Sequence, residues 1–383
     1  MELWRLSVPA FTLQPVSLLE KMSHYCAPNA LMENAYKIQD PKERFVSILG
    51  WIMFNWRSIP RVGLESSKPY NPALGEVFKC YWTHDNGDKT VFLAEQISHH
   101  PPVTAFRTHS KDRGDFKYEG WVYPITTISY YVKNLNTGPA TISFVPEGSD
   151  ERESYQLIQP PIAANGMMYG NKFIEIYDKM ELKCEKTGYS AVINFIAGGE
   201  NKLTGVIYKD GGAILDVHGV INKKVGITDM RSHTRILYDT LAVKRFPKYI
   251  NPLTQQDERE SRLIWHKVTV ALKEKNFDDA QLEKHLVEES ERALRKKYTE
   301  QHNAARAAEP PKVVEKAPPA KSGWFGSALS YVGLKDNSSA EEKHTGNFGH
   351  AGFTPKYYAI EGDLENNWKF TGTEIKFADG TSF

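Results

Sequence analysis

Two adjacent histidines, His99 and His100, stand directly before two prolines at the end of an apolar run. Pro101 has no backbone N–H and a fixed φ, and it pushes His100 toward an extended conformation. The two imidazoles are therefore held at the stiffened end of a strand. Two donors that can carry positive charge suit an anionic group such as a phosphate at this position.

Two other interpretations of this histidine pair are open. The pair can be structural, with each imidazole bonded to the backbone. It can also bind a metal, but the only acidic neighbour, Glu95, lies ~13 Å away along an extended strand. No cysteine or aspartate stands closer, so we expect no metal and no cofactor.

A second candidate for anion binding is the stretch from Lys68 to Glu76. Pro69 and Pro72 stiffen it as a turn, so Lys68 and Asn71 can face the same way. A cation beside an amide suits a phosphate or a polar lipid headgroup. An ordinary proline-rich connector with a solvated lysine has the same composition, and taken alone this stretch favours the connector.

A third candidate is helical. Lys284, Glu288 and Arg292 follow one another at intervals of four residues, which places them on one face of a helix. The common role of such spacing is a ladder of ion pairs within the helix. The functional interpretation is that Glu288 holds both cations in place while they also face an anionic ligand.

The segments around these candidates predict a mainly β fold with flanking helices (α+β). Residues 17–58 have helical spacing, with Ser17 and Asp40 as caps of successive helices. Residues 76–245 contain many short alternating runs separated by turn residues, which is typical of a barrel or a sandwich. Residues 257–300 return to helix, rich in Glu, Lys, Arg and Leu.

Composition narrows the function classes. The 383 residues are 40% hydrophobic and 25% charged, with a formal net charge of +1, so no overall field attracts nucleic acid. Three widely spaced cysteines without metal-ligand spacing favour a reducing compartment. The sequence has no apolar run of membrane-spanning length and does not start like a signal peptide. We expect a cytoplasmic monomer.

The order of the three candidates resembles the lipid-binding domain of the oxysterol-binding protein-related family. The likeness runs from about Leu6 to Lys297, and its clearest part is Glu95 to Pro102. Further matching stretches are Val8 to Leu13, Glu43-Arg44-Phe45, Lys68 to Glu76, Gly188 to Ala191, and Glu260-Ser261-Arg262.

This resemblance implies a near-complete antiparallel β-barrel that encloses one lipid. It also implies exchange of phosphatidylinositol 4-phosphate for a second lipid at membrane contact sites, with peripheral membrane association. The implied headgroup-binding residues are Lys68, Asn71, His99, His100, Lys284, Glu288 and Arg292.

The resemblance also divides the chain. Residues 1–16 are expected to form a lid, in which Val8, Pro9, Phe11 and Leu13 cover the cargo. The lipid-binding domain is expected at residues 17–300 and a linker or low-complexity insertion at residues 301–352. Residues 353–383 are expected to pack back on the domain.

Within the insertion, residues 323–334 predict an interfacial membrane helix. Trp324, Phe325, Leu329 and Val332 fall on one apolar face, opposite small uncharged residues. Packing on the barrel or binding of a protein partner is the alternative for this segment.

Three function classes fit these motifs: a lipid carrier, a lipid hydrolase or phosphatase, and a phosphoinositide sensor. A non-enzymatic lipid carrier is favoured over a hydrolase or phosphatase, because no G-x-S-x-G, Cys-x5-Arg or clustered carboxylates accompany the histidines. A phosphoinositide sensor without net transport is the third class. For the second lipid, Val8 to Glu20 is more similar to branches that carry phosphatidylserine than to those that carry sterol, so phosphatidylserine is slightly favoured over sterol.

Overall fold

The structure, a computed structural model, describes most of the chain. The described residues are 9–62, 67–99, 102–128, 132–138, 140–165, 173–239, 242, 244–308, 353–360 and 368–383. His100, Val8 and the predicted membrane helix at 323–334 lie outside these ranges, so the predictions made for them stay predictions.

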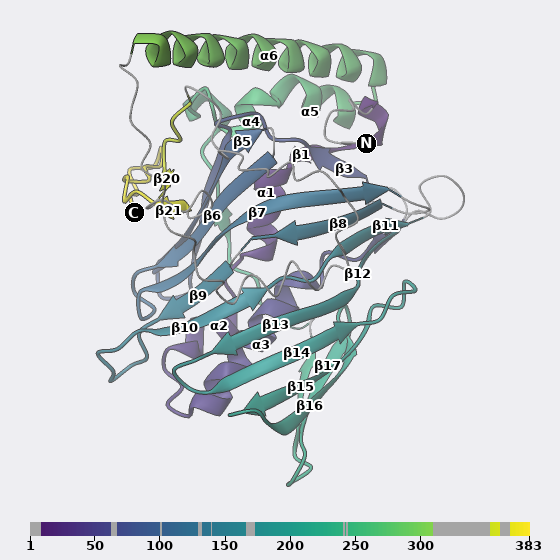
Figure 1. Cartoon of the computed structure of the whole chain (residues 1–383), viewed down its shortest axis with the longest axis vertical. Helices are drawn as coiled ribbons and strands as arrows, with labels where there is room; N and C mark the ends of the chain where they lie inside the picture. Colours follow the sequence, from purple (N-terminus) through teal and green to yellow (C-terminus); the bar gives the residue numbers. More distant parts are fainter. Residues whose placement is uncertain are drawn as a thin grey trace.

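Antiparallel strands, each paired with its neighbours, close into one barrel (Figure 1). This confirms the mainly β fold expected from the alternating runs. The barrel strands are β2 (Arg61–Val62), β4 (Val77–Thr83), β5 (Lys89–His99), β6 (Pro102–Ser110), β7 (Phe116–Ile128), β8 (Val132–Thr137), β9 (Ala140–Phe144), β10 (Glu153–Ile158), β11 (Ile162–Asn165), β12 (Phe173–Ile176), β13 (Asp178–Cys184), β14 (Tyr189–Phe195), β15 (Lys202–Lys209), β16 (Gly212–Val220), β17 (Lys224–Asp229), β18 (Arg235–Asp239) and β19 (Lys248–Tyr249).

Three helices precede most of the barrel: α1 (Leu18–Tyr25), α2 (Ala30–Ala35) and α3 (Pro41–Trp56). The predicted caps are present, because Ser17 accepts a hydrogen bond from Leu19 N and Asp40 accepts two from the first turn of α3. From Arg44 onward α3 is buried on every side rather than on one stripe. The main hydrophobic core therefore forms between this helix and the barrel wall, for example where the ring of Trp51 meets Phe116 edge-on at 5.5 Å.

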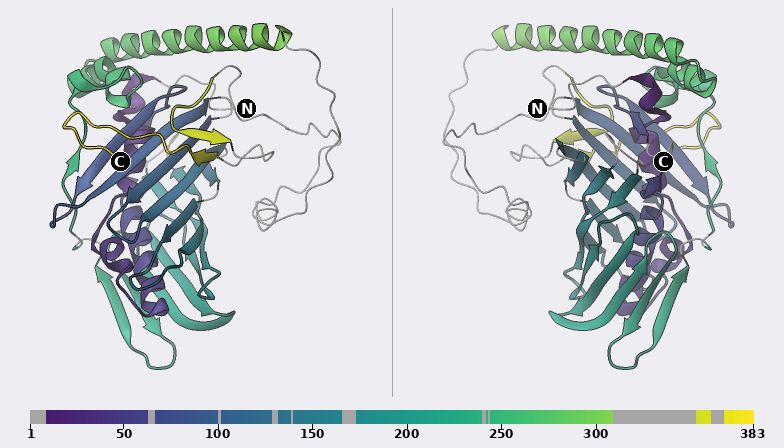
Figure 2. Two further views of the ribbon diagram at one scale, coloured as in Figure 1. Left: turned by 90° about the vertical axis from the view of Figure 1, so that its left-hand side faces the viewer. Right: turned by 90° about the vertical axis from the view of Figure 1, so that its right-hand side faces the viewer.

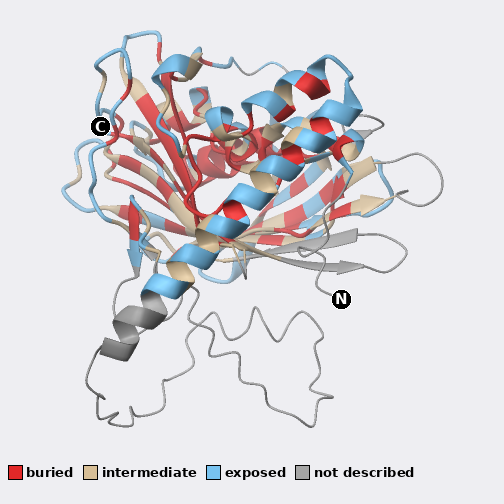
Figure 3. Ribbon diagram, turned by 90° about the horizontal axis from the view of Figure 1, so that it is seen from above, coloured by how far each residue is buried: buried red, intermediate tan, exposed pale blue. Residues whose placement is uncertain are grey.

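Helices α4 (Ser261–Ile264), α5 (His266–Lys273) and α6 (Phe277–Ala308) follow the last barrel strand. Figure 2 shows α6 crossing one end of the barrel, and Figure 3 shows a mostly exposed outer face on this helix. We expected the helix to end near residue 300, with a linker beginning at 301. The structure corrects this boundary, because alanine and arginine in residues 304–308 are strong helix formers that extend α6 to Ala308.

Two small sheets complete the fold. A 3-10 turn, η2 (Ala10–Thr12), leads into β1 (Leu13–Ser17), which pairs in parallel with β3 (Lys68–Tyr70). Strands β20 (Tyr358–Ile360) and β21 (Trp368–Phe370) lie in the C-terminal segment. Residues from this segment, including Tyr357 and Phe377, share a second hydrophobic cluster with β4, β5 and β6.

Candidate functional site

The side chains of Lys68 and Asn71 face each other, as their spacing across the proline turn predicts. Lys68 Nζ donates a hydrogen bond to Asn71 Oδ1 at 2.6 Å. The strand that carries Lys68 is anchored by Tyr70, which is buried and stacks on Trp265 with ring centroids 4.6 Å apart. The first three residues of the predicted turn thus form a paired strand, and Lys68 stands on a fixed backbone rather than in a loose connector.

The ammonium of Lys68 is electrostatically coupled to helix α6. Burial among protein atoms and the positive charge of Lys284 lower the pKa of Lys68 to about 8, while Glu288 opposes this shift. Lys68 as a residue is nevertheless exposed to solvent. Lys68 is therefore partly desolvated by neighbouring protein atoms while water still reaches it.

Helix α6 carries the three charges expected on one face. Lys284 Nζ lies 2.6 Å from Glu288 Oε1, and Arg292 Nη2 lies 3.9 Å from Glu288 Oε2. Arg292 also pairs with Glu289. The ladder of ion pairs is thus real, but Lys284 is buried and acts on Lys68 of another element, so the ladder is more than an intrahelical surface feature.

His99 is the last residue of β5 and pairs in register with Pro102, the first residue of β6. A bulge between Gln96 and Ser98 shifts the register just before the histidine. Gln96 Nε2 donates to the Ser98 carbonyl at 2.7 Å, which fixes the bulge. A bulge changes the direction of the side chains that follow it, so this bulge sets the direction in which His99 leaves the end of β5.

Backbone hydrogen bonds join the first two motifs at one end of the barrel. Gly75 N donates to the Gln96 carbonyl at 2.8 Å, and Gln96 N donates to the Glu76 carbonyl at 2.9 Å. The stretch that begins at Lys68 therefore ends beside the strand that ends at His99. The structure brings Lys68, Asn71, Lys284, Glu288 and Arg292 together and places His99 at the same end.

The carboxylate of Glu95, the acidic neighbour of the histidine pair, bonds to the backbone of the C-terminal segment. Both carboxylate oxygens of Glu95 accept backbone N–H groups, from Lys356 at 2.6 Å and from Tyr357 at 2.9 Å. Among the described residues, no group of three or more histidine, cysteine or carboxylate side chains could hold a metal ion.

Glu76 is a residue whose importance the sequence analysis missed. Its carboxylate is fully buried and accepts hydrogen bonds from Ala73 N at 2.9 Å, Ser261 Oγ at 2.7 Å and Trp265 Nε1 at 2.8 Å, and also from Ser17 Oγ. Burial raises the pKa of Glu76, and these four donors oppose the shift. One carboxylate therefore ties the start of α1, the Lys68 turn, α4 and α5 together. Its place at the end of the Lys68–Glu76 motif was the signal available in the sequence.

The segment predicted to form the lid lies against the same elements. Ala10 N donates to Gln281 Oε1 on α6 at 2.9 Å, and Leu13 is buried opposite Lys68 in the β1–β3 pairing. Pro9 and Phe11 are exposed, the latter by 63%. The described part of this segment therefore contacts α6 through the backbone of Ala10 and β3 through Leu13, while Phe11 stays exposed; its role as a lid remains a prediction.

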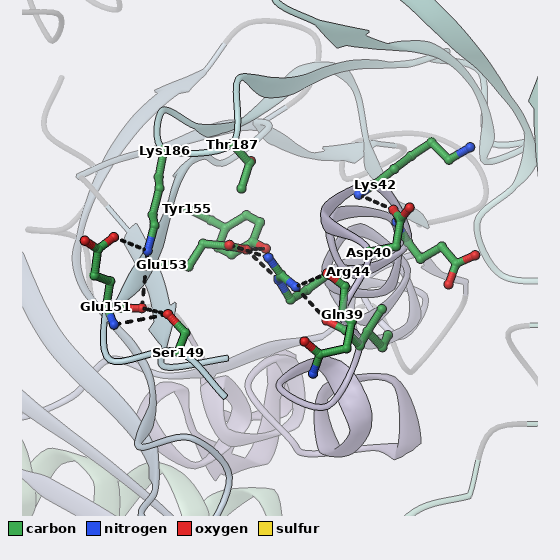
Figure 4. A network of polar contacts seen from close by, with 12 residues as sticks. Gln39, Asp40, Lys42, Arg44, Ser149, Glu151, Glu153, Tyr155, Lys186 and Thr187 are labelled. Carbon is green, nitrogen blue, oxygen red and sulfur yellow. Dashed lines mark hydrogen bonds and ion pairs between the residues drawn. The ribbon is translucent and has the colours of Figure 1, made fainter. Parts of the chain in front are cut away.

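A second polar cluster surrounds Arg44 at the start of α3 (Figure 4). The guanidinium of Arg44 forms two bonds with Glu153, at 2.9 and 2.6 Å, and also donates to the carbonyls of Ile38 and Gln39. A cavity of about 410 Å³ opens beside it, with Lys186 and Lys209 in its lining. Each of these lysines pairs with its own carboxylate, so we interpret the cluster as the anchor of α3 in the barrel.

Across the described ranges, no helix combines the length and the apolarity that crossing a bilayer requires. The predicted membrane contacts Trp324, Phe325, Leu329 and Val332 lie outside those ranges.

Comparison with known proteins identifies the family. The family model described as oxysterol-binding protein matches residues 1–271. Oxysterol-binding protein-like protein OBPa of Candida albicans is 31% identical over 310 residues, which cover 78% of this chain and 69% of that protein. Oxysterol-binding protein-related protein 8 of Homo sapiens is 30% identical over 307 residues, which cover 76% of this chain and 33% of that protein.

Solved structures share the fold. The Osh1 ORD domain in complex with cholesterol has a TM-score of 0.68 and 20% identity, covering 96% of this chain and 83% of that chain. The Osh3 ORD of Saccharomyces cerevisiae in complex with PI(4)P has a TM-score of 0.59 and 16% identity, covering 96% of this chain and 85% of that chain. With the family model matched over residues 1–271 and relatives at 30% identity or more, the chain belongs to the oxysterol-binding protein family.

Proposed function

We propose that this protein is a non-enzymatic lipid carrier that binds phosphatidylinositol 4-phosphate and exchanges it for a second lipid between membranes. The observation that carries the proposal is the coupling of Lys68 to Lys284 and Glu288 across two separate elements. Cations from β3 and α6 converge there beside an amide, and one carboxylate is shared among them. This arrangement has the charge and the donors that an inositol phosphate needs.

The proposed headgroup site works by charge neutralisation. A phosphate between β3 and α6 takes hydrogen bonds from Lys68 and Asn71 on one side and from Lys284 and Arg292 on the other. Glu288 keeps the two α6 cations oriented. His99 and His100 complete the site from the end of β5. Because no step breaks a covalent bond, the phosphate leaves as it arrived.

Solved relatives with bound lipids support the lipid-binding part of this proposal. The Osh3 ORD was solved in complex with PI(4)P, and the Osh1 ORD domain was solved in complex with cholesterol and with ergosterol. We favour phosphatidylserine as the second lipid, from the likeness of the Val8–Glu20 stretch to branches that carry it. There are two alternatives: an exchanger of sterol for phosphatidylinositol 4-phosphate, and a phosphoinositide sensor that does not transport lipid. We place the protein in the cytoplasm, bound peripherally where two organelle membranes meet.

A transfer experiment with purified full-length protein tests the proposal. Donor liposomes carry phosphatidylinositol 4-phosphate and acceptor liposomes carry phosphatidylserine, and lipid movement is followed in both directions. The carrier predicts movement of the phosphoinositide that speeds up when phosphatidylserine is present. Acceleration by sterol instead identifies the sterol exchanger, and binding without movement identifies the sensor. Loss of the 4-phosphate during incubation contradicts the carrier and indicates an enzyme.

A further inference from the structure

We infer that residues 353–357, here called the C-terminal clasp, position helix α6 against the strands of the headgroup site. The inference rests on the proposed function for its ligand but on geometry alone for the clasp itself. Residues 353–357 follow α6 by more than forty positions in the sequence, yet they contact both α6 and the motifs at the barrel end.

The clasp is fixed on β5 through Glu95. Glu95 is 1% exposed, and its two carboxylate oxygens accept the consecutive N–H groups of Lys356 and Tyr357 at 2.6 and 2.9 Å. Burial raises the pKa of Glu95, while these N–H groups and the charge of Lys356 oppose the shift. Tyr357 is buried beneath them in the cluster with Val77. The acidic residue of the histidine motif thus anchors a distant segment instead of binding a ligand.

The other end of the clasp reaches α6. The ring of Phe353 lies 5.7 Å from the ring of Tyr298, centroid to centroid. The same ring covers Gly75, where an added Cβ would come within 2.8 Å of it. Gly75 also has a φ of +72°, so both its conformation and its neighbour require glycine. Phe353 therefore fills the space between the Lys68–Glu76 stretch and the second half of α6.

A second connection between the Lys68–Glu76 stretch and α6 runs through Arg259. Arg259 bonds to Glu291 of α6 at 2.6 and 3.1 Å and also donates to the Leu74 carbonyl. Arg259 and Phe353 contact adjacent residues of that stretch, Leu74 and Gly75. On α6 they contact Glu291 and Tyr298, which lie on the same inward face. Arg292 stands directly after Glu291, between the two anchored positions. Loosening the clasp should therefore release the helix segment that presents Arg292.

The test compares Phe353→Ala with the matched control Phe370→Ala. Both phenylalanines are half-buried in the C-terminal segment, but the ring contacts of Phe370 are with Tyr358 and Arg107 and not with α6. The first measurement is hydrogen exchange in the full-length protein without lipid. We expect Phe353→Ala to speed exchange in residues 291–300 by about 3- to 10-fold, the range expected when one aromatic contact is removed. Phe370→Ala should leave these residues at the wild-type rate.

The second measurement is the affinity for phosphatidylinositol 4-phosphate and for phosphatidylserine. A positioning role predicts a several-fold loss for the phosphoinositide alone, restored in Phe353→Tyr, with the thermal midpoint close to wild type. Wild-type exchange rates in Phe353→Ala, or equal effects of both variants, overturn the clasp. If the wild type binds no phosphoinositide, the proposed function fails, and the exchange measurement still decides the clasp.

Discussion

The positive charge of Lys284 on α6 lowers the pKa of Lys68 on β3, so two ammonium groups from opposite halves of the chain are electrostatic neighbours. Like charges at close range are unfavourable unless an anion lies near both of them. Glu288 supplies one negative charge, which Lys284, Lys68 and Arg292 share. A phosphate carrying ~1.5–2 negative charges at pH 7 would compensate the remaining positive charge.

The affinity for an inositol phosphate headgroup should fall as the pH rises above 8. The pKa of Lys68 is about 8 without ligand. A bound phosphate stabilises the charged form of Lys68 and so raises this pKa. Below pH 8 Lys68 is already charged, so this contribution is complete. Above pH 8 binding must take up a proton, and affinity should fall up to about tenfold per pH unit. Calorimetric titration with a soluble headgroup measures the profile.

Two variants test whether Lys68 causes this pH dependence. Lys68→Met should bind more weakly and lose the decline above pH 8. Lys267→Met, which removes an exposed lysine paired with Glu283 at 3.7 Å, should keep the wild-type profile. A decline that survives in Lys68→Met would assign the titration to another group. Any further tightening from about pH 8 to about pH 6 is expected from His99 and His100.

Removing Glu153 should destabilise the protein strongly. Glu153 and Arg44 are both buried and bonded through two oxygens and two nitrogens. Glu153→Gln leaves the Arg44 charge buried and unpaired, which costs about 3–5 kcal/mol of unfolding free energy. Denaturant unfolding measures this, with Glu151→Gln as the control. Glu151 pairs with Lys186 on the surface at 2.9 Å, so no measurable change is expected there, and an equally small change in Glu153→Gln would show that the buried pair is unimportant.

Deleting residues 1–13 should separate membrane binding from transport. The described part of this segment contributes the bond from Ala10 to Gln281 and the buried side chain of Leu13. Without it, we expect membrane binding to persist and lipid transfer per protein to fall, because cargo is no longer covered. Liposome flotation and transfer assays measure the two properties. Transfer at the wild-type rate by the truncated protein would exclude a lid role for this segment.

Local features of the sequence predict local structure well in this chain. Ser17 and Asp40 cap helices as expected, since capping depends on a few neighbouring residues. The spacing of Lys284, Glu288 and Arg292 predicts a shared helix face because four residues are close to one turn. The three motifs were recognisable as anion-binding candidates because their residue types limit the chemistry available to them.

Long-range partners could not be predicted in the same way. Glu76 directly precedes β4 and Glu95 lies within β5, and both carboxylates are buried. Neither position indicates in the sequence which groups will be its hydrogen-bond donors. Their donors come from Trp265 and Tyr357, far along the chain, and only the folded barrel brings these together. The same holds for the contact of Phe353 with Gly75, where the glycine signals a tight position but not what occupies the space.

The central claim is that the barrel end carrying Lys68, His99 and α6 binds the phosphate of a phosphoinositide. Its most direct test is extraction of phosphatidylinositol 4-phosphate and of phosphatidylinositol from liposomes, by wild type and by the double variant His99→Ala with His100→Ala. A double variant of two exposed histidines, His218→Ala with His233→Ala, is the control. The account predicts that wild type and control extract only the phosphorylated lipid, and that the His99/His100 variant stays folded and loses extraction. Extraction at the wild-type rate by a well-folded His99/His100 variant would contradict it.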